Sequence, residues 1–158
     1  MIGAGIGALS GGLIGNYMDK QEAELRSQLA GSGVSVSRSG NNLVLNMPSD
    51  ITFATGRADL DGDFRRTLDA VATVLRKYNR TLVDVTGHTD NVGARDYNFR
   101  LSDRRANTVA DHLRSRGVVP QRLVVSGRGP DQPVASNSTA NGRQLNRRVT
   151  VQLRPLQQ

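Results

Sequence analysis

The sequence predicts an α/β domain, a two-layer sandwich in which a mixed β-sheet carries helices on one face. Predicted strands and helices alternate after residue 30, and crossovers of this length form right-handed βαβ units. The predicted final strand, residues 148–153, alternates strictly between apolar and polar side chains, which indicates a sheet with one face open to solvent. The 158 residues suffice for one domain of about 100 to 150 residues with an appendage, but not for two.

The first 30 residues differ in composition from the rest, so we expect a glycine-zipper leader and short helix over 1–30 and the folded domain over 31–158. Residues 1–15 contain six of the seventeen glycines and no charge. Gly3, Gly7, Gly11 and Gly15 would share one helical face, where backbones can approach closely in a lipid setting. The run is shorter than the about 20 apolar residues that span a bilayer. In water we expect this run to be a flexible leader, and a membrane-apposed glycine zipper is the alternative. We also expect that a natural leader is missing before Met1.

The predicted elements of the first half follow in order. Strong helix formers predict a short amphipathic helix over residues 16–29. Alternating valines and serines, a turn at SGNN and an apolar run over 43–47 predict a hairpin. Ile51 and Phe53, after Pro48, predict a short extended segment. Three aspartates then mark a helix start, and an apolar stripe follows at helical spacing: Phe64, Leu68, Val71, Leu75 and Tyr78.

The second half alternates strand and helix. TLVDVTG predicts a strand that ends at Gly87, and a helix is expected over roughly 97–116, closing at Gly117. Val118 and residues 123–125 predict the next strand. A polar loop leads to a helical turn near residues 140–145, before the final strand.

Composition narrows the chemistry. The chain has no cysteine, which excludes disulfides, thiol nucleophiles and thiolate metal sites. Residues 80–158 contain thirteen arginines and six aspartates, whereas the whole chain has two lysines. Guanidinium groups suit carboxylates and phosphates, so an arginine-rich polyanion-binding module is one hypothesis, and a codon preference is the other explanation. We expect no nucleic-acid partner, because an aromatic stacking platform and a recognisable motif are lacking.

One predicted strand end and the helix after it carry the candidate site. GHTD, residues 87–90, lies just past the strand, at the edge where open α/β sheets bind ligands. In the helix, Arg105 interrupts an apolar stripe formed with Tyr97, Leu101 and Val109. An inward guanidinium must be paired, because an unpaired buried charge is costly. Asp90 and Arg105 therefore either form a structural salt bridge or stand apart and hold the two ends of a zwitterion.

The segment GHTDNVGARDYNFRLSDRRANTVADHL resembles the peptidoglycan-binding core of the OmpA-like C-terminal domain family, whose pattern is GHTD, then G, then NxxLSxxRA. The match continues with GV, RL, G, QP and GRxxNRRV, and it covers roughly residues 45–154. The glycine-rich run, YMDKQEAELR and LNMPSDITFATG are similar to YiaD-type outer-membrane lipoproteins.

This resemblance implies a ligand, because the family binds the meso-diaminopimelate of the peptidoglycan stem peptide through its free ammonium and carboxylate. It implies that Asp90 accepts the ammonium and Arg105 binds the carboxylate. Thr89 and Asn98 would support these contacts, and Leu101 would wall the pocket. By strand alternation Arg147 is a further constrained cation and a helper. Phe53 lies where family members line the pocket, and Ala54 stands where many of them carry an acid.

The resemblance also implies a non-catalytic protein without a cofactor. Its partner would be peptidoglycan, and it would lie on the periplasmic face of the outer membrane, attached through a missing leader or the glycine-zipper segment. A wall hydrolase is the remaining alternative, but nothing near Asp90 supplies a poised nucleophile or an acid/base pair. With His88 and His112 as the only histidines, we expect no metal site.

Overall fold

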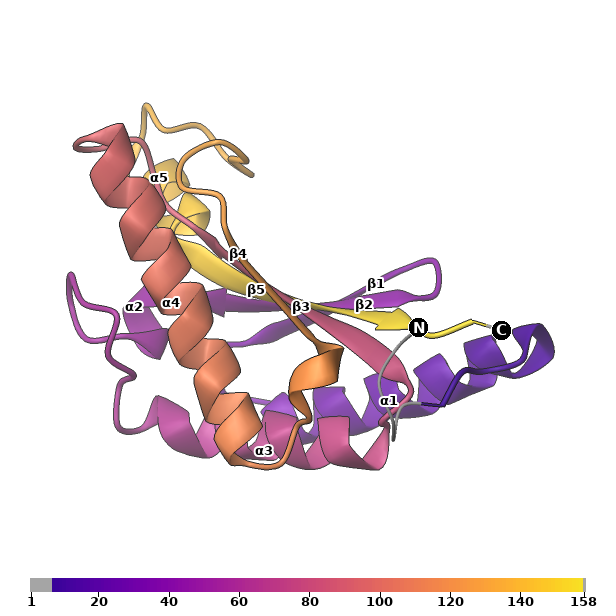
Figure 1. The fold of residues 1–158 in the computed structure, drawn as a ribbon. Coiled ribbons are helices and arrows are strands. Elements are labelled where there is room, and N and C mark those ends of the chain that lie inside the picture. The colour runs from indigo at the N-terminus through magenta and orange to yellow at the C-terminus, as the bar shows by residue number, and fades with distance from the viewer. Residues whose placement is uncertain (1–6, 158) are drawn as a thin grey trace.

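The computed structural model describes residues 7–157 and contains one five-stranded mixed sheet, which confirms the predicted fold class (Figure 1). The strands are β1 (Ser35–Ser39), β2 (Asn42–Pro48), β3 (Thr81–His88), β4 (Leu123–Gly127) and β5 (Arg148–Pro155), in the spatial order β1-β2-β5-β3-β4. The helices are α1 (Ile14–Leu29), α2 (Ser49–Thr52), α3 (Phe64–Lys77), α4 (Arg95–Ser115) and α5 (Ala140–Asn146), with 3₁₀ turns η1 (Gly11–Leu13) and η2 (Pro120–Arg122).

The last strand lies inside the sheet. β3 and β4 are parallel neighbours joined by α4, as expected of a βαβ unit. β5 is antiparallel to both β2 and β3 and separates them, so β2 and β3 run in the same direction without touching as a pair. As a result β2 and β3 end, and β5 begins, at the same edge of the sheet.

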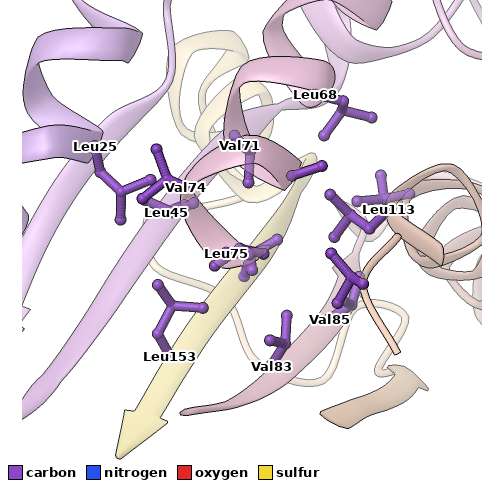
Figure 2. Packing of buried hydrophobic residues seen from close by; sticks show 14 of the residues in the cluster. Leu25, Leu45, Leu68, Val71, Val74, Leu75, Val83, Val85, Leu113 and Leu153 are labelled. Atoms are coloured by element: carbon purple, nitrogen blue, oxygen red, sulfur yellow. The ribbon is translucent and has the colours of Figure 1, made fainter. Parts of the chain in front are cut away.

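The hydrophobic core fills the space between one face of the sheet and helices α1, α3 and α4 (Figures 1 and 2). Inward residues of β5, such as Val151 and Leu153, are fully buried, whereas Thr150 and Gln152 between them are partly exposed. The predicted stripe of α3 is buried as expected: Leu68, Val71 and Leu75 pack in this core. The alternation in β5 therefore reflects a sheet covered by helices on one side.

The N-terminal helix packs against the rest of the domain. α1 lies on α3 and on β1, and its Met18 and Leu25 are fully buried in the common core. The Leu9 amide donates to the Leu156 carbonyl at 2.6 Å, which joins the two ends of the described chain. The division after residue 30 stays a prediction about domain organisation.

The glycine-zipper pattern is only partly described. Gly3 lies outside the described residues. Gly7 is in an irregular segment, Gly11 is in η1 and Gly15 is in the first turn of α1, so these three do not share one helical face as predicted. In residues 7–157 no helix is both long and apolar enough to cross a membrane.

Two local predictions are wrong. Ile51 lies in the single helical turn α2, because Pro48 ends β2 and the chain turns at once, and only Phe53 is extended. Val118 lies outside the strand, because η2 intervenes before β4. The hairpin, α3, α4 with Gly117 behind it, and α5 lie where they were predicted, within a few residues.

Candidate functional site

A cavity of about 410 Å³ opens at the sheet edge where β2 and β3 end and β5 begins. The strand ends supply its floor, the first half of α4 supplies one wall, and the segment after α2 supplies another. Its lining consists of Ser49, Asp50, Phe53, Ala54, Thr55, Gly56, Thr89, Asp90, Tyr97, Asn98, Leu101, Arg105 and Arg147. All seven residues selected from the sequence line this cavity, although their roles remain predictions.

Two glycines let α4 lie close enough to form the wall. A Cβ atom on Gly87, at the end of β3, would lie 2.1 Å from the Ser102 carbonyl oxygen. A Cβ on Gly127, at the end of β4, would lie 2.5 Å from the Asp103 nitrogen. Since real Cβ atoms do not approach backbone so closely, glycine at both positions permits this helix–sheet distance. The contact places Asn98, Leu101 and Arg105 over the sheet edge.

Arg105 is a buried cation without a counterion. Its residue is 6% exposed, and in residues 7–157 no carboxylate lies within 4.0 Å of its guanidinium. Nε donates to the Arg57 carbonyl at 2.8 Å, and the guanidinium carbon lies 4.9 Å from the centre of the Phe53 ring. Burial lowers the pKa of Arg105 from its usual value, and nearby Tyr97 and Asp50 oppose that effect.

Asp90 is paired with Arg147, which the sequence did not indicate. Arg147 Nη1 lies 2.7 Å from Asp90 Oδ2, and the Val92 amide donates to Oδ1 at 3.0 Å. The salt bridge between Asp90 and Arg105, one of the two alternatives raised by the sequence, is therefore absent. The two stand apart in one cavity, but Asp90 is neutralised by the strand-proximal arginine, since β5 inserts beside β3 and brings residue 147 to residue 90.

Thr89 and Asn98 hold the turn that carries Asp90. The Thr89 amide donates to the Gly129 carbonyl at 2.9 Å, and its hydroxyl donates to the Asp90 carbonyl at 2.7 Å. Asn98 Nδ2 donates to the Val92 carbonyl at 2.9 Å. Leu101, 8% exposed, supplies apolar wall beside them. These contacts restrain the backbone of residues 89–92, so the Asp90 carboxylate has a defined position.

Sequence reasoning missed part of the lining. Tyr97, expected to face inward, is 45% exposed where it borders the cavity. Ser49 and Asp50 were not selected at all. The Ser49 residue is 3% exposed, and its hydroxyl has no hydrogen-bond partner in the described chain. The signal was available, because SD directly follows Pro48 at a strand end, as HTD does on β3.

His88 lies just behind the site without lining it. It is 3% exposed, and its Nδ1 atom has no partner among residues 7–157. Burial lowers the pKa of His88 to about 4, and the positive charges of Arg148 and Arg128 add to the effect. In the described part of the chain no three His, Asp or Glu side chains are grouped to hold a metal.

Comparison with known proteins shows which family the chain belongs to. Residues 52–147 match the model of the OmpA family, and residues 1–22 match a glycine-zipper model. The chain belongs to the OmpA family. This membership agrees with the resemblance seen in the sequence, including its YiaD-like character.

Several curated OmpA-family relatives are similar to the chain. It is 50% identical over 146 residues to "Probable lipoprotein YiaD" of Escherichia coli, covering 92% of this chain and 67% of that protein. It is 40% identical over 105 residues to "Outer-membrane lipoprotein YfiB" of Pseudomonas aeruginosa, covering 66% of this chain and 62% of that protein. The chain thus spans about two thirds of each relative. Both are described as lipoproteins, not as enzymes.

Solved structures share the OmpA-family fold. A MotB-like protein from Desulfovibrio vulgaris matches with a TM-score of 0.79 and 23% identity, over 90% of this chain and 96% of that chain. The structure described as the cell wall anchor of the T6SS from Pseudomonas aeruginosa matches with a TM-score of 0.74 and 33% identity, over 85% of this chain and 99% of that chain.

Proposed function

We propose that this protein binds peptidoglycan without catalysis, through the meso-diaminopimelate of the stem peptide, and so tethers the outer membrane to the cell wall. Membership of the OmpA family supports the proposal. So does the 33% identity with a structure described as a cell wall anchor. Similarity to two lipoproteins, one of them described as an outer-membrane lipoprotein, supports the location at the periplasmic face of the outer membrane.

The observation that carries the proposal is the buried, unpaired Arg105. Arg105 is 6% exposed, and among residues 7–157 no carboxylate lies within 4.0 Å of its guanidinium, so holding this cation costs folding free energy. A ligand carboxylate would supply the missing charge, and the planar guanidinium can bind it through two parallel hydrogen bonds. Phe53 stacks on the guanidinium and keeps its plane oriented for that contact.

The ammonium of the guest is assigned to Asp90. Because Arg147 already binds Asp90, an incoming zwitterion exchanges one internal ion pair for two external ones: its ammonium contacts Asp90, and its carboxylate draws on Arg105 and Arg147. The Arg147 side chain is 34% exposed and has room to turn toward the ligand, whereas the Asp90 side chain, 11% exposed, stays in place. Arg147 thus keeps Asp90 neutralised until the ligand arrives.

The arginine-rich half has an explanation other than polyanion binding. Arg105, Arg122 and Arg148 are buried. Five further arginines of residues 80–158 form ion pairs with aspartates of this chain, namely Arg95, Arg114, Arg116, Arg147 and Arg154. Eight of the thirteen arginines in residues 80–158 are therefore buried or paired within the fold, which favours wall binding over the polyanion hypothesis.

The test is retention on purified sacculi, comparing the wild type with Asp90→Ala, Arg105→Ala and Arg105→Lys. Asp90→Ala and Arg105→Ala each remove a charge-assisted contact worth about 1.5 to 3 kcal/mol, so the affinity for sacculi should fall about tenfold or more. The lysine variant should also bind poorly, because a point charge lacks the two-pronged geometry. Arg104→Ala is the matched control, since Arg104 is the exposed neighbour outside the cavity.

Retention equal to wild type in folded Asp90→Ala and Arg105→Ala would contradict the proposal. A salt titration separates it from polyanion binding, which should weaken by orders of magnitude between 50 and 200 mM salt, whereas a partly buried contact should weaken much less. Release of soluble muropeptides from the sacculi would indicate a hydrolase instead.

A further inference from the structure

Two opposite charges in the cavity lack an ionic partner. Asp90 and Arg147 neutralise each other at 2.7 Å, whereas Asp50 and Arg105 form no ion pair within the part of the chain that the structure describes. Asp50 accepts one hydrogen bond, from Gln144 Nε2 at 3.1 Å. The remaining separated pair of charges in the cavity lining is therefore Asp50 and Arg105, on α2 and α4.

Ser49, beside Asp50, adds an unsatisfied group. Its hydroxyl is buried and has no hydrogen-bond partner in residues 7–157, and the residue lines the same cavity. Buried hydroxyl groups are nearly always hydrogen-bonded, so an unpaired one calls for an explanation. A hydroxyl oxygen next to a carboxylate suits an ammonium, which has three donor hydrogens and no acceptor.

The contacts of the two aspartates differ. Both Asp90 oxygens already accept strong hydrogen bonds, one from Arg147 and one from the Val92 amide. Asp50 belongs to an exposed residue and has a single neutral donor. An ammonium can therefore reach Asp50 without displacing a cation, in the cavity that Asp90 also lines.

We propose that Asp50 is a specificity-determining residue of this cavity, which contacts the ammonium of the bound diaminopimelate together with the Ser49 hydroxyl. The inference rests on the proposed function and adds a second acidic contact to it. Since Ala54 provides no charge on the neighbouring segment, Asp50 is the carboxylate that α2 and the segment after it contribute to the cavity lining. The pocket then discriminates guests by their amino group as well as by their carboxylate.

The experiment uses calorimetry to measure the dissociation constants of two stem peptides, each binding to the full-length protein chain. One peptide contains meso-diaminopimelate, and the other contains 2-aminopimelate, which keeps the distal carboxylate but lacks its amino group. Asp50→Asn should weaken the diaminopimelate peptide about tenfold or more. The same substitution should change the dissociation constant of the aminopimelate peptide by no more than about twofold, because this peptide has no distal ammonium that could lose a contact.

Two further variants test the Ser49 contact and control for the change in net charge. Ser49→Ala should weaken the diaminopimelate peptide severalfold while the melting temperature stays unchanged or rises, since an unpaired buried hydroxyl is removed. Asp103→Asn is the matched control: it changes the net charge equally on an exposed residue of α4 that does not line the cavity. It should bind both peptides like the wild type.

Each outcome is decisive. If Asp50→Asn binds the diaminopimelate peptide as the wild type does, Asp50 has no role and the proposed function stands without it. An equal loss for both peptides would also overturn the inference, because it would show an effect independent of the ammonium. Failure of the wild type to bind either peptide, or sacculi, would overturn the proposed function itself.

Discussion

Arg105 and Arg122 allow the same substitution to be compared at two buried arginines. Arg105 is 6% exposed and Arg122 is 1% exposed, and burial lowers the pKa of both. They differ in their partners. Arg105 donates one side-chain hydrogen bond, to the Arg57 carbonyl. Arg122 donates to the carbonyls of Leu75, Tyr78 and Thr81 and to the Thr81 hydroxyl, which joins the end of α3 to the start of β3.

Arg→Met at the two positions should therefore have opposite effects on the free energy of unfolding. Arg122→Met strands several buried acceptors at a helix C-terminus, and we expect a loss of about 3 to 5 kcal/mol. Arg105→Met loses one hydrogen bond and a stacking contact, together about 1 to 3 kcal/mol, but it removes a desolvated charge that costs at least as much. We expect this variant to be as stable as the wild type or up to about 2 kcal/mol more stable.

Urea denaturation with a matched thermal melt measures both effects. For a chain of this size about 1 kcal/mol corresponds to about 2 to 4 °C, so Arg122→Met should melt about 10 °C lower and Arg105→Met at or above the wild-type temperature. Sacculus retention should be lost in Arg105→Met alone, once Arg122→Met is assayed below its melting temperature. If Arg105→Met were destabilised as much as Arg122→Met, Arg105 would be a structural residue, and the argument that it is reserved for a ligand would fail.

Two further predictions concern residues beneath the site. His88 binds a proton with a pKa of about 4 when folded and 6.5 when unfolded, so the unfolded state takes up more protons in that range and stability falls as the pH drops from 6.5 to 4, by about 3 kcal/mol. Denaturation across this range should show a shallower fall for His88→Gln than for the wild type, and parallel curves would refute the assignment. Gly87→Ala should cost about 3 kcal/mol or more and weaken sacculus binding, because its Cβ would displace α4 at Ser102. Wild-type stability and binding in that variant would show that α4 can move without consequence.

The pattern of side chains predicted most elements because each depends on neighbours in the chain. The α3 stripe, the hairpin and the final alternating strand express periods of 3.6 and 2 that are legible in the sequence. Ile51 shows the limit of such local patterns. An apolar residue after Pro48 fits a strand or a turn equally well, and packing at the end of β2 selected the turn.

Some residues of the candidate site were likewise predictable from the sequence, and others only from the structure. Asp90 and Arg105 were recognisable because GHTD follows a strand and a cation interrupts an apolar helical face, and the motif resemblance added Thr89, Asn98, Leu101, Arg147 and Phe53. Ser49 and Asp50 also follow a strand end, but that position alone does not reveal which other strand ends lie beside it. They become part of the cavity because β2 and β3 end at one edge, which depends on the whole order of the sheet.

The sequence alone was enough to predict the fold class, the family and the two principal charged residues of the candidate site, Asp90 and Arg105, since these predictions rest on short-range periodicity and on a spaced motif. The ion-pair partner of Asp90 could not be predicted in this way. Arg147 is 57 residues away along the chain, and it reaches Asp90 because β5 inserts between β2 and β3. Strand insertion depends on the packing of the entire sheet. It pairs Arg147 with Asp90 and leaves Arg105, of the two arginines that line the cavity, without an ion pair in the described residues.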